Sequence, residues 1–371
     1  MVIYVICFLL SIAFAYLAKR SKRRAMFIFL SILSIAVTVT LAGLRDVSIG
    51  IDTSNYYKGT WATAMMSSSL RSYFRNILRS SSSRFEVLFT ILVGLAAKGT
   101  GSFHVFKFMI HAIIIVCVYV GAFRMREHAD PVFTLLLFYF LYYNHSLNIS
   151  RQYVSMAIIF AAAADIEHRK ILRYLLLVFV ATLFHNTGLL GLMPLMIYLV
   201  LYPQKRLRNV SLTRRLFIIA LIAAVYVGFV PLIQLLLSKG VLSAHYATYV
   251  RGVKEPIPGS VIIMLFAEAA LLALCWKSFR ANNKYGDFFL FTSVMFLVLY
   301  CMAPMIYYGK RVAAYLSFIN IITVGMTTKT FQRKSNQRII KGLVVFFAAA
   351  YWLYFYAYMN GSRTVPYILG V

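Results

Sequence analysis

The sequence predicts an all-α polytopic membrane protein, and three properties of the chain support this fold class. Of 371 residues, 61% are hydrophobic and 13% are charged, whereas a soluble domain has about 45–50% and about 25%. The mean hydropathy is +0.78. Apolar stretches recur along the whole chain, and about 20 apolar residues span a bilayer core. These properties exclude an ordinary globular enzyme, a disordered protein and a nucleic-acid-binding module.

Thirteen apolar segments follow one another, and the shorter ones are expected to tilt, thin the bilayer or re-enter. In order they are 2–18, 25–43, 85–98, 103–123, 131–147, 152–165, 171–186, 188–202, 216–237, 259–277, 287–304, 311–328 and 339–357. We expect the first to be a retained helix, because a basic cluster follows its apolar run instead of preceding it. Little sequence remains for a soluble domain. We therefore expect one transmembrane domain over 1–371, with external loops at 44–84 and 238–258.

The distribution of charge predicts the topology. Lys and Arg total 38 and Asp and Glu total 10, which gives a net charge of +28. Cytoplasmic loops of membrane proteins are enriched in Lys and Arg. Of the 38 cations, 23 fall in six segments that we assign to the cytoplasm, namely 19–24, 124–128, 169–173, 205–215, 277–284 and 329–341.

If cytoplasmic and external loops alternate along the chain, the first third of the chain has one apolar segment too many. Both 85–98 and 103–123 lie between the external loop 44–84 and the cytoplasmic segment 124–128. The segment 85–98 is the shorter, so we expect it to re-enter or to cross only partway. This interpretation gives about 12 crossings with both termini outside.

The sequence lacks the cysteine spacings and the nucleotide-binding motif that are typical of several other classes of protein. Cys7, Cys117, Cys275 and Cys301 all lie inside apolar segments, without CxxC or Cys/His ligand spacing. We therefore predict neither a disulfide nor a zinc site. The sequence has no GxxxxGK[ST] phosphate loop, which excludes an ABC-type pump.

The first polar cluster, residues 44–57, directly follows an apolar segment. Arg45 offers the paired donors that suit phosphate, Asp52 is able to orient that arginine or to act as a base, and Gly50 permits a tight turn. The alternative is a surface loop with an internal Arg–Asp pair. Later in the same loop, three arginines interleave with apolar residues and predict a short amphipathic helix on the membrane surface. They are Arg71, Arg75 and Arg79.

A second cluster predicts one polar helix face at an outer helix mouth. Its residues, at helical spacing, are Asn144, Asn148, Arg151, Gln152 and Ser155. A charged residue in a membrane bundle is costly, so it points to function by default. The alternative is an interfacial turn.

Two further clusters and two carboxylates complete the candidates. His185, at the outer end of a segment, suits a phosphate hydrogen bond or proton transfer, or else a packed polar cap. Lys310 and Arg311 enter a segment from the outer side, which favours an anionic ligand over interface anchoring. Glu86 opens the segment 85–98, and Glu268 lies within another apolar segment, where a neutral, paired or proton-handling role stays open.

Taken in order, these motifs resemble the EpsG/Wzy-type polysaccharide polymerases of bacterial inner membranes. The resemblance rests on Leu-Arg-x-x-x-x-Gly-x-Asp-x-x-x-Tyr (Arg45, Gly50, Asp52, Tyr56), Glu86, Asn-x-x-Arg-Gln (Asn148, Arg151, Gln152) and Phe-His (Phe184, His185). A late Arg-x-x-x-Tyr (Arg311, Tyr315) and a closing Pro-Tyr (Pro366, Tyr367) also fit. Together the motifs span most of the chain.

The resemblance implies a GT-C-like glycosyltransferase that joins oligosaccharide units carried on undecaprenyl pyrophosphate, at the outer face of the inner membrane. Arg45, Arg151 and Arg311 are then expected to hold pyrophosphate, with His185 assisting and Asp52 or Glu86 as the base. Further expected contacts to substrate are Tyr56, Asn148, Gln152, Lys310 and Tyr315. The sequence has no DxD pair, so we expect no required metal and no cofactor. Expected partners are the lipid-linked donor and acceptor, the bilayer and a chain-length regulator, and no nucleic acid.

Three alternative functions use related substrates. A flippase for lipid-linked oligosaccharides needs charges deep in several helices, whereas here they cluster at outer helix ends. An O-antigen ligase usually carries a large late outer loop, and the loop 238–258 is short. A glycan-modifying acyltransferase is more distant from these motifs.

Overall fold

The computed structural model describes residues 1–79, 86–203, 210–240, 257–301 and 309–370. In these ranges the regular structure is helical, apart from one isolated β-bridge between Arg45 and Leu369. Each of the thirteen apolar segments contains a helix, which confirms the all-helical prediction for the described residues. By length and composition, five helices are able to cross a membrane: Val2–Arg20, Arg24–Gly43, Phe103–Arg124, Gly259–Ala281 and Lys334–Tyr358. The chain is therefore a membrane protein, and the number of about 12 crossings stays a prediction.

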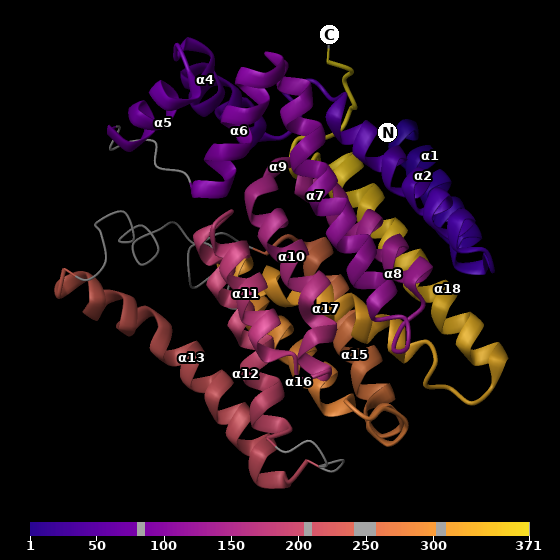
Figure 1. The fold of residues 1–371 in the computed structure, drawn as a ribbon. Coiled ribbons are helices and arrows are strands. Elements are labelled where there is room, and N and C mark those ends of the chain that lie inside the picture. The colour runs from indigo at the N-terminus through magenta and orange to yellow at the C-terminus, as the bar shows by residue number, and fades with distance from the viewer. Residues whose placement is uncertain (80–85, 204–209, 241–256, 302–308, 371) are drawn as a thin grey trace. The chain divides into compact units, whose positions relative to one another are not determined.

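The described helices form two compact units (Figure 1). Unit 1 comprises Met1–Leu189 and Val344–Val371, and unit 2 comprises Leu190–Leu343. The helices that lie wholly in unit 1 are α1 (Val2–Arg20), α2 (Arg24–Gly43), α3 (Ile51–Tyr56), η1 (Tyr57–Trp61), α4 (Ala62–Met66), α5 (Leu70–Arg79), α6 (Val87–Thr100), α7 (Phe103–Arg124), α8 (Pro131–Phe138), η2 (Tyr139–Tyr143), α9 (Asn144–Asn148), α10 (Ser150–Glu167), α11 (Ile171–Thr182) and η5 (Trp352–Tyr358). Two helices run across the division between the units: η3 (Asn186–Gly191) and α18 (Lys334–Tyr351).

The core of unit 1 is the packing of α7 against α2 and α10, with α1 beside α2 and α11 beside α10. Small residues allow these close approaches. Gly121 of α7 lies against the ring of Phe160 on α10, where a side chain at Gly121 would overlap the ring. The run Ala161–Ala164 keeps the following turn of α10 narrow. Unit 1 is therefore a close-packed bundle around α7 and α10.

Ion pairs gather the basic loops at one end of unit 1. Lys19 Nζ lies 2.8 Å from Asp130 Oδ2, and Asp130 also caps α8 by accepting from Val132 N–H at 3.0 Å. At the ends of α7 and α10, Arg124 Nη2 lies 2.5 Å from Asp165 Oδ1. Arg173 at the start of α11 lies 3.5 Å from the same carboxylate. The segments 19–24, 124–128 and 169–173 thus meet at one end, as expected for three loops on one side of a membrane.

The opposite end of unit 1 carries the short helices α3, α4, α5 and α6 (Figure 1). Near the start of α6, the N–H of Leu88 donates to the carbonyl of Leu183, just after α11. The end of α6 leads into α7, whose His104 Nδ1 lies 2.9 Å from the carbonyl of Gly43 at the end of α2. Both ends of α6 therefore contact residues at this end of the unit, and the expectation that 85–98 does not fully cross stays a prediction.

The helix expected at 71–79 is present as α5. Its Tyr73 is fully buried, donates to the carbonyl of Thr90 at 3.4 Å and lies against Gly94 of α6. Arg71 and Arg75 are exposed. The apolar side of α5 thus packs on α6, and its basic side faces outward.

Unit 2 is a second all-helical bundle. Its helices are α12 (Leu192–Leu201), α13 (Leu212–Ser238), α15 (Gly259–Asn282), α16 (Gly286–Cys301) and α17 (Gly309–Thr327). The helix α16 packs against α12, α13, α15 and α17, and it contributes several buried aromatic residues, such as Phe288, Phe289 and Phe291. Unit 2 is therefore organised around α16.

Candidate active site

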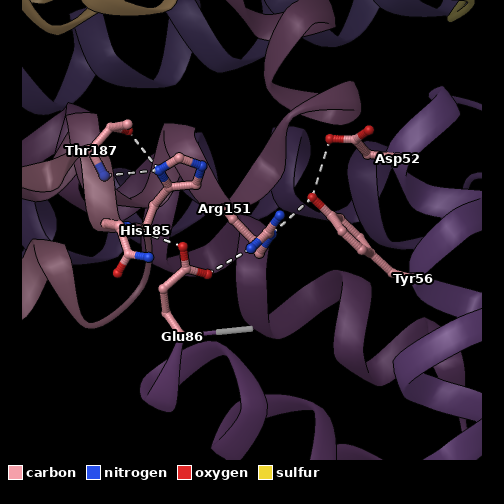
Figure 2. Close-up of polar contacts among 7 residues, drawn as sticks. Asp52, Tyr56, Glu86, Arg151, His185 and Thr187 are labelled. Carbon is pink, nitrogen blue, oxygen red and sulfur yellow. Dashed lines mark hydrogen bonds and ion pairs between the residues drawn. The ribbon is translucent and has the colours of Figure 1, made fainter. Parts of the chain in front are cut away.

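Arg151 and Glu86 form the centre of a hydrogen-bonded cluster in unit 1 (Figure 2). Arg151 lies in the first turn of α10 and Glu86 is the N-cap residue of α6, so two helix starts converge here. Arg151 Nη1 donates to Glu86 Oε2 at 2.6 Å, and the two side chains are 19% and 9% exposed. The cluster is therefore built on a short, largely buried and charge-assisted pair.

Two aromatic rings lie close to the Arg151 guanidinium. Its Cζ lies 5.5 Å from the ring centroid of Tyr56 and 5.3 Å from that of Phe89. Its Nε also donates to the Tyr56 hydroxyl at 3.2 Å. Cation–π contact and a directed hydrogen bond together require a planar guanidinium, which a lysine ammonium does not provide.

Tyr56 connects Arg151 to Asp52. The two residues are four positions apart on α3, so they share a helix face. The Tyr56 hydroxyl donates to Asp52 Oδ2 at 3.2 Å, as Figure 2 shows. Burial raises the pKa of the Tyr56 phenol above its usual range, so the phenol keeps its proton. Asp52 is partly exposed, and its Oδ1 has no partner in the described part of the chain.

Glu86 uses both of its carboxylate oxygens. Oε2 accepts from Arg151, and Oε1 accepts from the backbone N–H of Asn186 at 3.0 Å. One carboxylate thus ties the start of α6 to α10 and to the turn after α11. This arrangement suits positioning better than proton abstraction.

His185 lies in that turn and is oriented by Thr187. Its Nδ1 accepts from the Thr187 N–H at 3.3 Å and lies 2.6 Å from Thr187 Oγ1. A ring nitrogen that accepts from a backbone N–H carries no proton, so we assign the proton of the neutral ring to Nε2. Figure 2 shows the ring between Thr187 and Arg151.

Gly188 allows this turn to lie close to α10 and α11. A Cβ at Gly188 would lie 2.6 Å from Ser155 Oγ and 2.7 Å from the backbone of Ala181. Neighbouring atoms of α10 and α11 occupy the space where a Cβ of residue 188 would lie, so this close approach requires a glycine.

The expected polar face over 144–155 is interrupted, so the prediction that these residues share one helix face is wrong. The helix α9 ends at Asn148 and α10 begins at Ser150, because Ile149 adopts φ −96° and ψ 54°. Asn144 turns toward the C-terminal part of the chain, where it accepts from Trp352 Nε1 at 2.7 Å and donates to Thr364 Oγ1 at 2.9 Å. Arg151 faces the cluster, and Gln152 is buried.

The break between α9 and α10 exposes backbone that receives the loop 44–56. The Leu147 carbonyl accepts from Thr53 Oγ1 at 3.0 Å and from Arg45 Nη2 at 3.3 Å. Asn148 Oδ1 accepts from the Asp52 N–H at 3.1 Å. The loop therefore presents Asp52 in a fixed position.

Arg45 lies in a different environment from the one expected for a pyrophosphate ligand. It is 1% exposed and donates to the carbonyls of Ala42 and Leu147 and to Thr53 Oγ1. Burial lowers the pKa of its guanidinium to about 10, so it remains charged at neutral pH. In this structure Arg45 binds protein oxygens and holds the loop.

The residues that cover Arg45 come from the C-terminal segment 364–370. The Ile368 carbonyl accepts from the Asp46 N–H at 2.8 Å, and the Gly370 N–H donates to the Leu44 carbonyl at 2.8 Å. Tyr367 donates to the Leu41 carbonyl at 3.0 Å. The closing Pro-Tyr motif was the only sequence signal for this contact.

Three predicted ligands belong to unit 2. Lys310 and Arg311 lie in the first turn of α17 and are partly exposed, whereas Tyr315 is 2% exposed. The outer part of that predicted motif, 305–308, lies outside the described residues.

Comparison with known proteins gives one match. The model of the EpsG family matches residues 27–369, which is nearly the whole chain and contains every residue of the cluster. No curated protein and no solved structure matches.

Proposed function

Because this chain belongs to the EpsG family, we propose that it is a membrane glycosyltransferase that polymerises oligosaccharide units carried on undecaprenyl pyrophosphate. The cluster of Arg151, Tyr56 and Asp52 is the observation that supports the proposal most. It combines a fixed cation with a partly exposed carboxylate at one end of a membrane bundle. Transfer from a pyrophosphate donor to a hydroxyl needs both groups.

Arg151 and His185 are the proposed ligands of the donor pyrophosphate. When the bond from the anomeric carbon to the phosphate oxygen breaks, the lipid pyrophosphate takes the electron pair and gains negative charge. A cation held in place by Tyr56 and Glu86 stabilises that charge without reorganisation. The His185 tautomer assigned above places a donor, Nε2–H, in the same region.

Asp52 is the proposed base. The acceptor hydroxyl forms the new bond to the anomeric carbon, and its proton passes to the Asp52 carboxylate. Tyr56 supports Asp52 because its hydroxyl donates to Oδ2 and leaves Oδ1 for the acceptor. Glu86, which the sequence offered as the other base, is proposed to position Arg151.

Arg45, Asn148 and Gln152 are proposed to shape the site. Arg45 and Asn148 hold the loop that carries Asp52. Gln152 directly follows Arg151 in the first turn of α10, and its side chain is buried. In unit 2, Lys310, Arg311 and Tyr315 stay proposed substrate ligands, because two cations at one helix start suit a second anionic lipid carrier.

We place the reaction at the outer face of the bacterial inner membrane. The cluster lies at the end of unit 1 opposite the paired loops 19–24, 124–128 and 169–173. Positive loops mark the cytoplasmic side. We propose about 12 crossings in a GT-C-like fold, with α6 not crossing fully.

The lipid-linked glycan profile of a deletion strain tests this function. A polymerase predicts single repeat units on the outer face of the membrane and no polymer, with recovery by the wild-type gene. Units trapped on the inner face would indicate a flippase, and long unattached chains would indicate a ligase. Either result would reject the proposal.

The variants Arg151→Ala and Arg311→Ala extend this test to the residues. Each is expected to abolish polymer while the protein remains in the membrane at the wild-type level. Polymer of normal length in both variants would reject the site.

A further inference from the structure

A polar pocket lies in unit 2 where four helix ends meet. It has a volume of about 50 Å³ and is lined by Tyr202, Arg215, Arg280, Asn283, Lys284 and Asp287, with Gly286 at its wall. A cavity that holds a single water molecule has a comparable volume of about 10–15 Å³. The pocket therefore has room for a group of several heavy atoms.

Cationic side chains outnumber acidic ones in this pocket. Asp287, which is 7% exposed, pairs with two arginines: Arg215 Nη2 lies 3.1 Å from its Oδ2 and Arg280 Nε lies 2.8 Å from its Oδ1. Lys284 is exposed, and its Nζ lies 5.0 Å from the Tyr285 ring centroid. Three cations thus surround one carboxylate, which leaves an excess of positive charge for an anion to neutralise.

Donors in the pocket remain without acceptors. The buried Nε of Arg215 has no hydrogen-bond partner in the part of the chain that the structure describes. The short contact between Arg280 Nε and Asp287 Oδ1 is an ion pair without hydrogen-bond alignment, so this N–H and the Asp287 oxygen both lack a hydrogen bond. Two guanidinium donors and one acceptor are thus unsatisfied in the described part of the pocket. Unsatisfied buried donors are costly, and a bound anion removes that cost.

The backbone holds the pocket walls together. A Cβ at Gly286 would lie 3.0 Å from Arg280 Cα and 3.0 Å from the Phe279 carbonyl oxygen. The end of α15 therefore approaches the start of α16 closely, and the 16-residue α16 adds its positive helix terminus to the pocket. The arginines and the helix start converge because of this approach.

We propose that this pocket binds a phosphate-type oxyanion, separately from the glycosyl-transfer site. Paired guanidiniums, a lysine and a helix start are the donors that proteins use for phosphate groups. The segments 205–215 and 277–284, which bring Arg215 and Arg280, are those that charge assigns to the cytoplasm. The phosphate comes either from the headgroup of an anionic lipid in that leaflet or from a soluble phosphorylated compound.

Thermal stability of the purified full-length protein tests the pocket. Inorganic phosphate is expected to raise the Tm of the wild type above the value in chloride of equal ionic strength, in a saturable manner. Phosphate also stabilises proteins by exclusion from their surface, so variants are needed. Lys284→Gln should lose the saturable shift, and Lys277→Gln, an exposed cation earlier on α15 and not part of the pocket, should keep it.

A charge-balanced variant guards against misfolding. Arg280→Gln combined with Asp287→Asn removes both ion pairs of Asp287 without changing the net charge. Because one guanidinium donor is lost, we expect at least a 10-fold weaker apparent affinity for phosphate. For the lipid source, native mass spectrometry after extraction from nanodiscs should show phosphatidylglycerol retained by wild type and Lys277→Gln and lost from Lys284→Gln. Retention of phosphatidylcholine to the same extent would count against the lipid source.

The proposal is overturned if Lys284→Gln and Lys277→Gln respond equally to phosphate and to phosphatidylglycerol. If neither phosphate nor phosphatidylglycerol distinguishes Lys284→Gln from Lys277→Gln, the pocket binds no oxyanion. A response to phosphate alone identifies a soluble ligand, and a response to phosphatidylglycerol alone identifies the headgroup. Both of these results support the pocket, and neither depends on polymerase activity.

Discussion

The backbone of Gly50 passes the carbonyl of Leu147 so closely that a Cβ at residue 50 would lie 2.6 Å from the carbonyl oxygen. Gly50 also has φ +84°, a backbone conformation that residues with a side chain rarely adopt. This contact sets the loop that carries Asp52 against the break between α9 and α10. The proposed base and the proposed cation therefore depend on one glycine for their spacing.

Gly50→Ala is expected to separate the loop from Leu147 and to abolish polymer. The strained backbone alone costs about 1–3 kcal/mol, and the overlap with a carbonyl adds to it. The measurements are polymer in a complemented deletion strain and the Tm of the purified protein. Gly59→Ala, in η1 with nothing within 4 Å of the added Cβ, should leave both unchanged. Wild-type polymer from Gly50→Ala would contradict the docking of the loop.

Arg151→Lys is expected to lower the rate of polymerisation by about 10²–10³-fold, the usual effect of losing one charge-stabilising donor. A lysine keeps the charge but loses the Nε hydrogen bond to Tyr56 and the contact of a guanidinium with the rings of Tyr56 and Phe89. Arg173→Lys serves as the control, because Arg173 is 59% exposed and forms only a 3.5 Å ion pair at the opposite end of unit 1. A rate near wild type for Arg151→Lys would show that charge alone is required.

Asp52→Asn and Glu86→Gln should separate the base from the positioning residue. Asp52→Asn is expected to abolish polymerisation with little change in Tm, since Asp52 is partly exposed and has a single side-chain partner. Glu86→Gln should lower the Tm because it leaves Arg151 uncompensated. The loss should be below the about 3–5 kcal/mol of a fully buried pair, since Arg151 is 19% exposed.

The pH–rate profiles decide between the two carboxylates. The residual activity of Glu86→Gln is expected to keep the acid-side fall in rate that reports protonation of the base. If that fall disappears in Glu86→Gln while Asp52→Asn remains active, the two roles are reversed.

Gly188→Ala is expected to displace the turn that carries His185 and the Asn186 N–H. Overpacking of this kind costs about 1–3 kcal/mol. Adding Ser155→Ala removes the 2.6 Å overlap with Ser155 Oγ but not the 2.7 Å overlap with the backbone of Ala181, so Tm and polymer should recover only in part. Gly99→Ala, in open space on α6, is the matched control. Full recovery in the double variant would show that the backbone contact is unimportant.

The helices were predictable because apolar runs of helical length are a local property of the sequence. Charge alternation also led to the expectation that 85–98 does not fully cross, which stays a prediction. The break at Ile149 was not predictable, since residues 144–152 contain no glycine or proline. The break lies against the loop that carries Gly50, almost a hundred positions earlier in the chain, and such a contact cannot be read from the local sequence.

The candidate site was predictable as a set of residues and not as a set of contacts. One sequence motif contains both Arg45 and Asp52. In the structure, however, Arg45 donates to the Leu147 carbonyl, and Asp52 accepts from the Tyr56 hydroxyl. Phe89 and Thr187 were missed, because neither residue type suggests a role until the fold places it beside Arg151 or His185. Partners of this kind are set by tertiary packing.

The segment 364–370 also has a consequence for biosynthesis. Thr364 accepts from Tyr4 through its carbonyl at 2.7 Å, and Ile368 and Gly370 pair with the loop after α2. The loop after α2 therefore lacks these contacts until Tyr367, 326 positions after Leu41, has been translated. A chain that stalls on the ribosome or is cleaved before residue 364 would leave this loop without them, so such products are expected to be inactive even when the preceding helices have been inserted.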